Sequence, residues 1–184
     1  DGKILFEGDY LNGKKWNGKG FDPEGNIVYE LEEGKGFIKE YNIKGEKLFE
    51  GEYLNGERNG EGSEYYGNTF FVGTYLKGKK WSGGGILGGA TYIILNGTGL
   101  AIEYNDIICE SIFIGMYVNG ERKQDGKEID VDGKYNFLGQ YSKGKRTKGK
   151  EINNKDGKII FEGEYINGNK YKGKGCIKER LDYE

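Results

Sequence analysis

The sequence has no histidine among its 184 residues, so the commonest general base and the commonest metal ligand of proteins are both missing. Ser/His and Cys/His catalytic pairs are excluded for the same reason. Only two cysteines occur, Cys109 and Cys176, which are too few for a disulfide framework and too far apart for a Cys-x-x-Cys metal site. This usage favours a reducing compartment, so we expect a cytoplasmic protein without a cofactor.

Proline and long apolar stretches are also scarce. The single proline, Pro23, argues against a flexible low-complexity linker despite 35 glycines, and no three-residue glycine period indicates collagen. Residues 82–102 carry no charge, but they include seven glycines, which argues against a membrane span. The formal net charge of −2 does not favour nucleic acid as a partner.

The charges are distributed unevenly along the chain. Residues 1–66 carry 15 acidic and 9 basic side chains, whereas residues 143–180 carry 12 basic and 5 acidic ones. A rod-shaped fold would therefore have an acidic end and a basic end. Three interpretations stay open, namely drift of solvent-exposed positions, end-to-end assembly, and docking on an anionic surface.

What the chain does contain is a repeat. The octapeptide FEGEYLNG at 49–56 recurs as FEGDYLNG near the start and as FEGEYING at 161–168, with looser copies between them. Two shorter segments, 29–42 and 92–105, align with each other without gaps and fill the double-length intervals. We therefore expect one array over residues 1–184, built of eight units of 20 to 24 residues. The units start at the aromatic residues Phe6, Tyr29, Phe49, Phe71, Tyr92, Phe113, Phe137 and Phe161.

Within a unit the residue types alternate with the period of a β-strand. In the first unit Phe6, Gly8 and Tyr10 share one face, and Glu7 and Asp9 lie on the other. A turn follows, in four units an Asn-Gly dipeptide of the kind that forms type I′ hairpin turns. A second strand then begins with Gly-x-Gly. The Asn-Gly turns are Asn12-Gly13, Asn55-Gly56, Asn119-Gly120 and Asn167-Gly168, and the Gly-x-Gly pairs are Gly18/Gly20, Gly60/Gly62, Gly83/Gly85 and Gly173/Gly175.

Eight such hairpins predict an all-β fold of about sixteen short strands. Glycine inside a strand commonly marks a close approach, so we expect an aromatic ring of a neighbouring hairpin to lie over these glycines. A single hairpin is marginally stable in water, and stacked neighbours must supply the buried surface. The expected fold is an elongated, twisted or curved antiparallel sheet one layer thick, with aromatic and glycine residues on its inner face and charged residues on its outer face.

The segment FEGEYLNGERNGEGSEY, which starts at Phe49, resembles the MORN repeat, with its aromatic-Glu-Gly-Glu-aromatic start, glycine turn and Gly-x-Gly second strand. The resemblance implies a solenoid of stacked hairpins used for protein–protein scaffolding, in some members through a concave aromatic face and in others at membranes or the cytoskeleton. The units are also similar to MORN-variant repeats of bacterial and protist proteins, some of which are antitoxin components. The chain departs from the pattern, and we expect local irregularity, at Leu31, Ile94, Gln124 and Glu151.

The first unit of the array is among the most regular ones, and the chain begins at a repeat boundary. DGKILFEGDY aligns residue by residue with DGKIIFEGEY at 156–165. Because terminal repeats are usually atypical, we expect the array to belong to a longer one.

Candidate catalytic and ligand-binding motifs have simpler structural explanations. Carboxylate pairs such as Glu50 and Glu52 fall on the outer, solvated face. The glycine run at 83–85 precedes neither a helix nor a Lys-Ser/Thr pair, so it does not fit a phosphate loop. DVDG at 130–133 resembles the start of a calcium loop, but the later ligand positions do not follow, and an Asp-Gly turn is the preferred interpretation. We expect neither enzyme activity nor a metal site.

Comparison of the two short units predicts an apolar patch. Three charged residues of the first unit are replaced by aliphatic ones in the second, and strand alternation places the first two on the solvent side. Exposed contiguous apolar area tends to mark a partner surface, so we expect a protein partner here unless a nearby segment containing Ile107 and Ile108 covers it. The replacing residues are Ile93, Leu95 and Ile102.

Tyrosines at equivalent positions of the units form a second candidate site. In the simpler interpretation they stack between hairpins, and in a functional one they also line a groove that receives an extended or helical partner segment. This tyrosine row consists of Tyr10, Tyr53, Tyr75, Tyr117, Tyr141 and Tyr165.

The lysine-rich C-terminal part is a third candidate, because it can meet anionic lipid headgroups. We expect foremost a non-enzymatic scaffold that binds a protein partner in the cytoplasm, with association to membranes or the cytoskeleton. The alternatives are a peripheral membrane module that uses the basic end, and an antitoxin-like protein. The basic set consists of Lys143, Lys145, Arg146, Lys148, Lys150, Lys170, Lys172 and Lys174.

Overall fold

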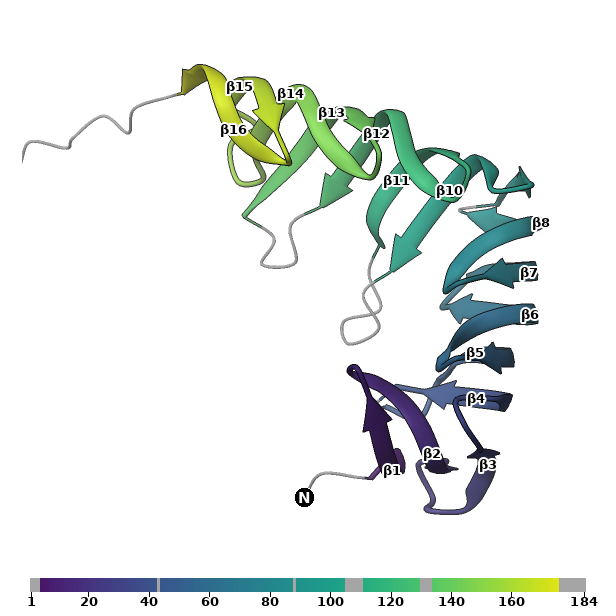
Figure 1. Cartoon of the computed structure of the whole chain (residues 1–184). Helices are drawn as coiled ribbons and strands as arrows, with labels where there is room; N and C mark the ends of the chain where they lie inside the picture. The colour runs from purple at the N-terminus through teal and green to yellow at the C-terminus, as the bar shows by residue number, and fades with distance from the viewer. Residues whose placement is uncertain (1–3, 43, 88, 105–110, 130–133, 176–184) are drawn as a thin grey trace, which may run out of the picture. The chain divides into compact units, whose positions relative to one another are not determined.

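The computed structural model describes residues 4–42, 44–87, 89–104, 111–129 and 134–175. Within these ranges all regular secondary structure is β-strand. This confirms the expected all-β class and the expected number of strands (Figure 1). The sixteen strands are β1 (Phe6–Leu11), β2 (Lys14–Phe21), β3 (Ile27–Leu31), β4 (Gly36–Tyr41), β5 (Lys47–Leu54), β6 (Glu57–Tyr66), β7 (Thr69–Leu76), β8 (Lys79–Leu87), β9 (Ala90–Leu95), β10 (Thr98–Tyr104), β11 (Ser111–Val118), β12 (Glu121–Ile129), β13 (Tyr135–Ser142), β14 (Lys145–Asn153), β15 (Ile159–Ile166) and β16 (Asn169–Gly175).

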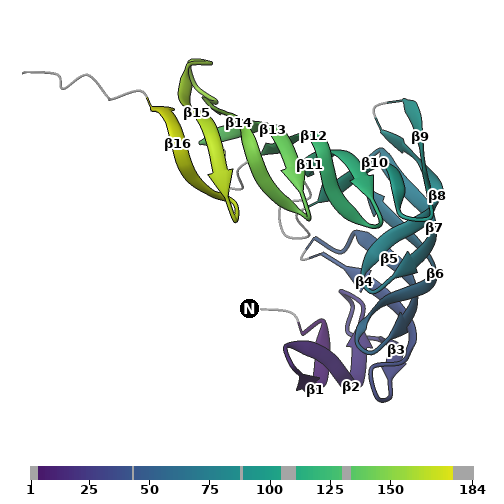
Figure 2. The same cartoon turned by 45° about the horizontal axis from the view of Figure 1, so that its top comes forward.

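The chain divides into two compact units. Unit 1 comprises Asp1–Leu100 and Tyr104–Glu110, and unit 2 comprises Ala101–Glu103 and Ser111–Glu184. In unit 1, β1, β2 and β3 form a small sheet, and β4 to β9 follow one another in chain order. In unit 2, β11 to β16 also follow one another in chain order, as both views show (Figures 1 and 2). The sheets are open and antiparallel, as expected.

Each repeat of the sequence is one hairpin. The first aromatic residue of the repeat lies in the first strand, and a two-residue turn leads to the second strand. Both turn residues have positive φ in all eight hairpins, so the predicted type I′ turn is confirmed at the four Asn-Gly turns and extends to the other four. The first turn residues and their φ angles are Asn12 51°, Glu33 49°, Asn55 55°, Lys77 50°, Asn96 49°, Asn119 53°, Lys143 49° and Asn167 54°.

Lys143→Asn is expected to stabilise unit 2 by about 0.5–1 kcal/mol, because lysine is strained in the left-handed conformation that asparagine adopts more readily. Thermal denaturation followed by circular dichroism measures the effect. Lys145→Asn is the control, since that residue lies in β14, where asparagine is disfavoured. A stabilisation by the control variant as large as that by Lys143→Asn would contradict the explanation.

The strand glycines pair with one another, and aromatic rings lie over them. Gly51 pairs with Gly62 across β5 and β6. A Cβ atom added to either glycine would lie 2.8 Å from Cζ of Phe49, and one on Gly62 would also lie 3.2 Å from Cε2 of Tyr75. The expected close approach is thus present, but the nearer ring belongs to the same hairpin, and the neighbouring hairpin supplies the second ring.

The first short repeat, which starts at Tyr29, interrupts the pairing of successive strands, as its departure from the repeat pattern predicts. The sheet order breaks between β3 and β4, which are joined next to their turn by an isolated bridge. Leu31 stands at a position where most repeats have glycine. It is 4% exposed and packs with Tyr29 and Ile38. A branched side chain prevents the close strand contact that glycine allows, so the two strands diverge around this cluster.

Candidate functional site

In unit 1 and in unit 2, the inner face of the sheet carries a ladder of aromatic rings. A phenylalanine contacts the tyrosine four residues later in its own strand and the tyrosine of the next hairpin, in most cases edge to face. The ring centroid of Phe137 lies 5.5 Å from that of Tyr141 and 5.3 Å from that of Tyr165. This geometry suits the quadrupoles of aromatic rings and adds to the burial of their apolar surface. The most deeply buried rings, at 0–1% exposure, are those of Phe49, Phe71, Phe113 and Phe137.

The predicted tyrosine row belongs largely to this ladder. Tyr10 is 60% exposed and Tyr53 is half-buried, but the other four side chains of the row are buried. They therefore stack between hairpins, as in the simpler interpretation, and do not line an open groove. The four buried members are Tyr75, Tyr117, Tyr141 and Tyr165.

A cation lies over the phenylalanine ring in six hairpins. The guanidinium Cζ of Arg58 is 4.2 Å from the ring centroid of Phe49, a distance at which the ring quadrupole attracts the charge. The cation is always the ninth residue after the phenylalanine, on the facing strand. The pairs are Lys15 on Phe6, Arg58 on Phe49, Lys80 on Phe71, Arg122 on Phe113, Arg146 on Phe137 and Lys170 on Phe161.

Buried and half-buried glutamates alternate with these cations. In unit 1 the two guanidinium nitrogens of Arg58 lie 2.7 Å from Glu40 and 2.6 Å from Glu64. The ammonium of Lys80 lies 2.5 Å from the second oxygen of Glu64. The hydroxyl of Tyr53 donates to Glu40 at 2.8 Å. Because each carboxylate meets at least one cation, the charge can be buried without a large desolvation penalty.

The same arrangement repeats in unit 2. There the hydroxyls of Tyr117, Tyr141 and Tyr165 donate to three glutamates that also meet arginine or lysine. One of these glutamates is Glu151, which departs from the glycine of the repeat and is 3% exposed. The ion pairs are Glu103–Arg122 at 2.6 Å, Arg122–Glu128 at 3.1 Å, Glu128–Arg146 at 2.6 Å, Arg146–Glu151 at 3.5 Å and Glu151–Lys170 at 2.6 Å.

The titration behaviour of these groups follows from the pairing. Burial alone would raise the pKa of Glu40, but the charge and the hydrogen bonds of Arg58 outweigh it and hold that pKa below its usual range. The pKa of Glu128 is lowered in the same way, by Arg146 against the effect of burial. Burial raises the pKa of Tyr141 well above its ordinary value. At neutral pH the carboxylates of Glu40 and Glu128 are therefore ionised and Tyr141 is neutral, so these groups stabilise the inner face as ion pairs and hydrogen bonds.

This network was not predicted from the sequence, because alternation along a strand assigns the charged residues to the outer face. A usable signal was present, since a lysine or arginine follows each phenylalanine of the repeat by nine residues. Two members of the predicted basic set are part of it. Arg146 and Lys170 lie over the rings of Phe137 and Phe161 and are ion-paired with Glu128 and Glu151; the Arg146 side chain is 16% exposed and that of Lys170 is 50% exposed. The remaining basic residues lie at the turn before β14 and on the outer face, where glutamates stand among them.

The outer face of unit 1 carries an exposed apolar patch. Val72 pairs with Gly84, which in turn pairs with Ile93, so the two apolar side chains flank a glycine on one face. Strand alternation places Phe70 beside Val72 and Leu95 beside Ile93 on the same face. We call Phe70, Val72, Ile93 and Leu95 the outer patch; their exposed fractions are 39%, 51%, 63% and 65%.

Ile102 does not belong to this surface. It was expected there by comparison with the other short unit, but it is 1% exposed, so that expectation is wrong. The adjacent Ala101 is also 1% exposed. Two consecutive buried residues show that the simple alternation between faces does not hold in this part of β10. Ile107 and Ile108, the expected cover, lie outside the described residues, as do Cys109, Cys176 and the DVDG segment at 130–133.

These features define the class of the protein as all-β, with hairpin repeats in open antiparallel sheets. No protein-family model matches the chain, and neither does any curated protein. The described residues include no helix that has the length and hydropathy needed to cross a bilayer.

Proposed function

We propose that the chain is a non-enzymatic scaffold that binds a protein partner through the outer patch. The observation that carries the proposal is the exposure of four large apolar side chains around Gly84. Contiguous apolar area of this kind tends to mark an interaction surface, and aromatic anchors often dominate binding energy. The resemblance to MORN repeats, which serve as scaffolds, supports the same conclusion.

The state of the inner face also supports an outer binding site. Most rings of the inner face are buried, and the cations and carboxylates above them are paired with each other. A partner that docked there would have to replace ion pairs whose separation leaves buried charges uncompensated. The outer patch has no such obstacle, because its side chains already stand in solvent.

Ile93→Glu combined with Leu95→Glu is expected to weaken capture of the partner by about tenfold or more, because charges in the core of an interface are unfavourable. Folding should be unaffected, since both side chains are exposed in the free protein. Quantitative mass spectrometry of a pull-down from the native source measures capture, and a thermal melt of each variant measures folding.

The matched control is Ile27→Glu combined with Leu54→Glu. These residues are also exposed apolar side chains of unit 1, at 52% and 44%, but they lie outside the outer patch. The control variant should capture the partner like the wild type. Equal loss of capture in both variants would argue against the outer patch, and unfolding of the Ile93/Leu95 variant would show that the patch is part of the core.

A further inference from the structure

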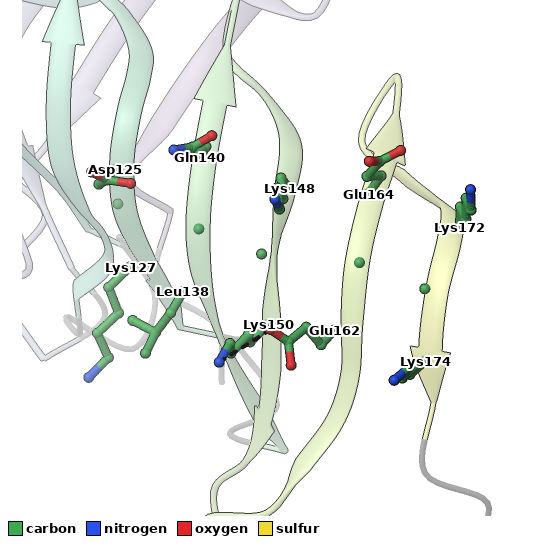
Figure 3. Close-up of a pocket in the computed structure, with 15 residues that line it drawn as sticks. Asp125, Lys127, Leu138, Gln140, Lys148, Lys150, Glu162, Glu164, Lys172 and Lys174 are labelled. Carbon is green, nitrogen blue, oxygen red and sulfur yellow. Dashed lines mark ion pairs between the residues drawn. The ribbon is translucent and has the colours of Figure 1, made fainter.

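The outer face of unit 2 contains a groove of about 1050 Å³ that crosses β12 to β16 (Figure 3). Its floor is the backbone of five glycines that are paired in register from strand to strand. Side chains alternate across a strand, so the residues before and after each glycine stand on the outer face and form two walls. The floor consists of Gly126, Gly139, Gly149, Gly163 and Gly173.

Each wall is a row of five side chains at matching positions of the five strands, as Figure 3 shows. Neighbouring members of a row are paired residues of the sheet, so the rows run across the strands and parallel to the floor. One wall consists of Lys127, Leu138, Lys150, Glu162 and Lys174, and the other of Asp125, Gln140, Lys148, Glu164 and Lys172.

The charges of the walls are ordered along the groove. Strands β14 and β16 each present two lysines, β15 between them presents two glutamates, and β13 presents an uncharged pair. Lys150 pairs with Glu162 at 3.3 Å. In the part of the chain that the structure describes, Lys148, Lys172 and Lys174 are exposed and have no ion pair. With five lysines against three carboxylates, the walls carry a net charge of +2.

The dimensions of the groove fit one extended polypeptide. Neighbouring strands lie about 4.8 Å apart, so the floor from β12 to β16 is about 19 Å long, and the walls stand about 7 Å apart. A polyproline II chain is extended and rises about 3.1 Å per residue, so about six residues span the floor. The lysine pairs of β14 and β16 are separated by about 9.6 Å, close to the rise of about 9.3 Å over the three residues of one polyproline II turn.

We propose that this groove binds an acidic peptide segment in the polyproline II conformation, whose carboxylates are three residues apart and therefore lie on one side of the segment. One carboxylate lies between Lys148 and Lys150 and the next between Lys172 and Lys174. A neutral or basic residue of the ligand faces Glu162 and Glu164. The floor offers few hydrogen bonds, because β12 to β15 are each paired on both sides within the sheet, so recognition depends on the wall side chains.

An anionic membrane fits the same surface less well. The two glutamates of β15 and Asp125 stand in the same rows as the lysines, so a continuous layer of anionic headgroups would meet them as well. Like charges brought together in this way oppose binding. A peptide avoids the conflict because it can place acidic residues only at the lysine pairs.

The test uses a fluorescein-labelled peptide of four Glu-Ser-Ser repeats and the full chain, with binding measured by fluorescence anisotropy at low salt. Lys148→Glu combined with Lys172→Glu is expected to weaken binding by about tenfold or more. Gln140→Trp should also weaken binding, because it fills the groove without a change of charge. The peptide with lysine in place of glutamate should not bind.

Lys143→Glu combined with Lys145→Glu is the matched control. It makes the same change in net charge within unit 2 but lies outside the groove, and glutamate already stands at the corresponding turn position of another hairpin, Glu33. Binding in this variant should stay within about threefold of the wild type. Equal losses in both double variants, or no binding of the peptide by the wild type, would overturn the proposal.

Sedimentation with vesicles that contain phosphatidylserine distinguishes a peptide ligand from an anionic membrane. The proposal is wrong if the wild type sediments with these vesicles through Lys148 and Lys172 while the peptide does not bind. The outer patch of unit 1 is a separate site, so the Ile93/Leu95 variant should bind the peptide like the wild type. The two proposals can therefore fail independently.

Discussion

Gly83→Ala is expected to destabilise the chain by about 2–3 kcal/mol, whereas Gly84→Ala, one residue later, should change the stability by less than about 0.5 kcal/mol or increase it. The two residues belong to the glycine run of β8. A Cβ atom on Gly83 would lie 2.3 Å from the carbonyl oxygen of Val72, 2.7 Å from Cα of Gly73 and 2.8 Å from the ring of Phe71. A Cβ atom on Gly84 would meet only the carbonyl oxygen of Tyr92, at 3.5 Å.

The contrast follows from the two faces of the strand. Gly83 faces inward, where the paired strand and a buried ring leave no space, so a methyl group must push the backbone of β7 away. Gly84 faces outward into solvent, and alanine there mainly restricts the unfolded chain. Urea denaturation followed by circular dichroism gives both free energies of unfolding. Similar values for the two variants would contradict the assignment of the faces.

Arg58→Met is expected to destabilise unit 1 by about 3 kcal/mol at neutral pH. Methionine can still cover the ring of Phe49, but it leaves the carboxylate of Glu40 without its cation. The side chain of Glu40 is 20% exposed and retains the hydrogen bond from Tyr53, whereas Glu64 keeps its ion pair with Lys80. The cost therefore comes chiefly from one buried, uncompensated charge.

This destabilisation should shrink as the pH falls. In the wild type Arg58 holds the pKa of Glu40 below its usual value, so the stabilisation that Glu40 provides is present at neutral pH and is lost at acidic pH. In the variant, burial raises the pKa of Glu40, so protonation relieves the cost as the pH falls. The difference in the free energy of unfolding between the two proteins should therefore narrow below about pH 5.

Urea denaturation at neutral pH and at about pH 4.5 measures the narrowing. Lys19→Met is the control, because Lys19 and Glu30 form an ion pair at 3.5 Å whose side chains are 53% and 67% exposed. Its loss should change the stability by less than about 0.5 kcal/mol at either pH. A pH-independent effect of Arg58→Met would mean that lost packing, and not the stranded carboxylate, causes the destabilisation.

Much of the fold could be predicted because its signals are local. The alternation Phe6, Gly8, Tyr10 and the Asn-Gly turns fix the strand, the turn type and the two faces within about ten residues. The predicted solvent exposure is confirmed for Ile93 and Leu95, which lie where alternation applies, whereas Ile102, where alternation does not hold, is buried. Phe70 and Val72 were missed because the strand register that brings them beside Ile93 is a contact between hairpins.

The sequence by itself determined the hairpins, their type I′ turns and the strand face that carries the aromatic rings, since each depends on neighbouring residues. Only the tertiary structure decided which charges are buried. Arg58, Glu64 and Arg146 look like solvated residues in the sequence, yet each meets a partner from an adjacent hairpin on the inner face. The same holds for the groove of unit 2, whose walls consist of residues drawn from five strands. Burial depends on the groups that pack against a side chain, and in a stack of hairpins those groups come from residues distant in the sequence.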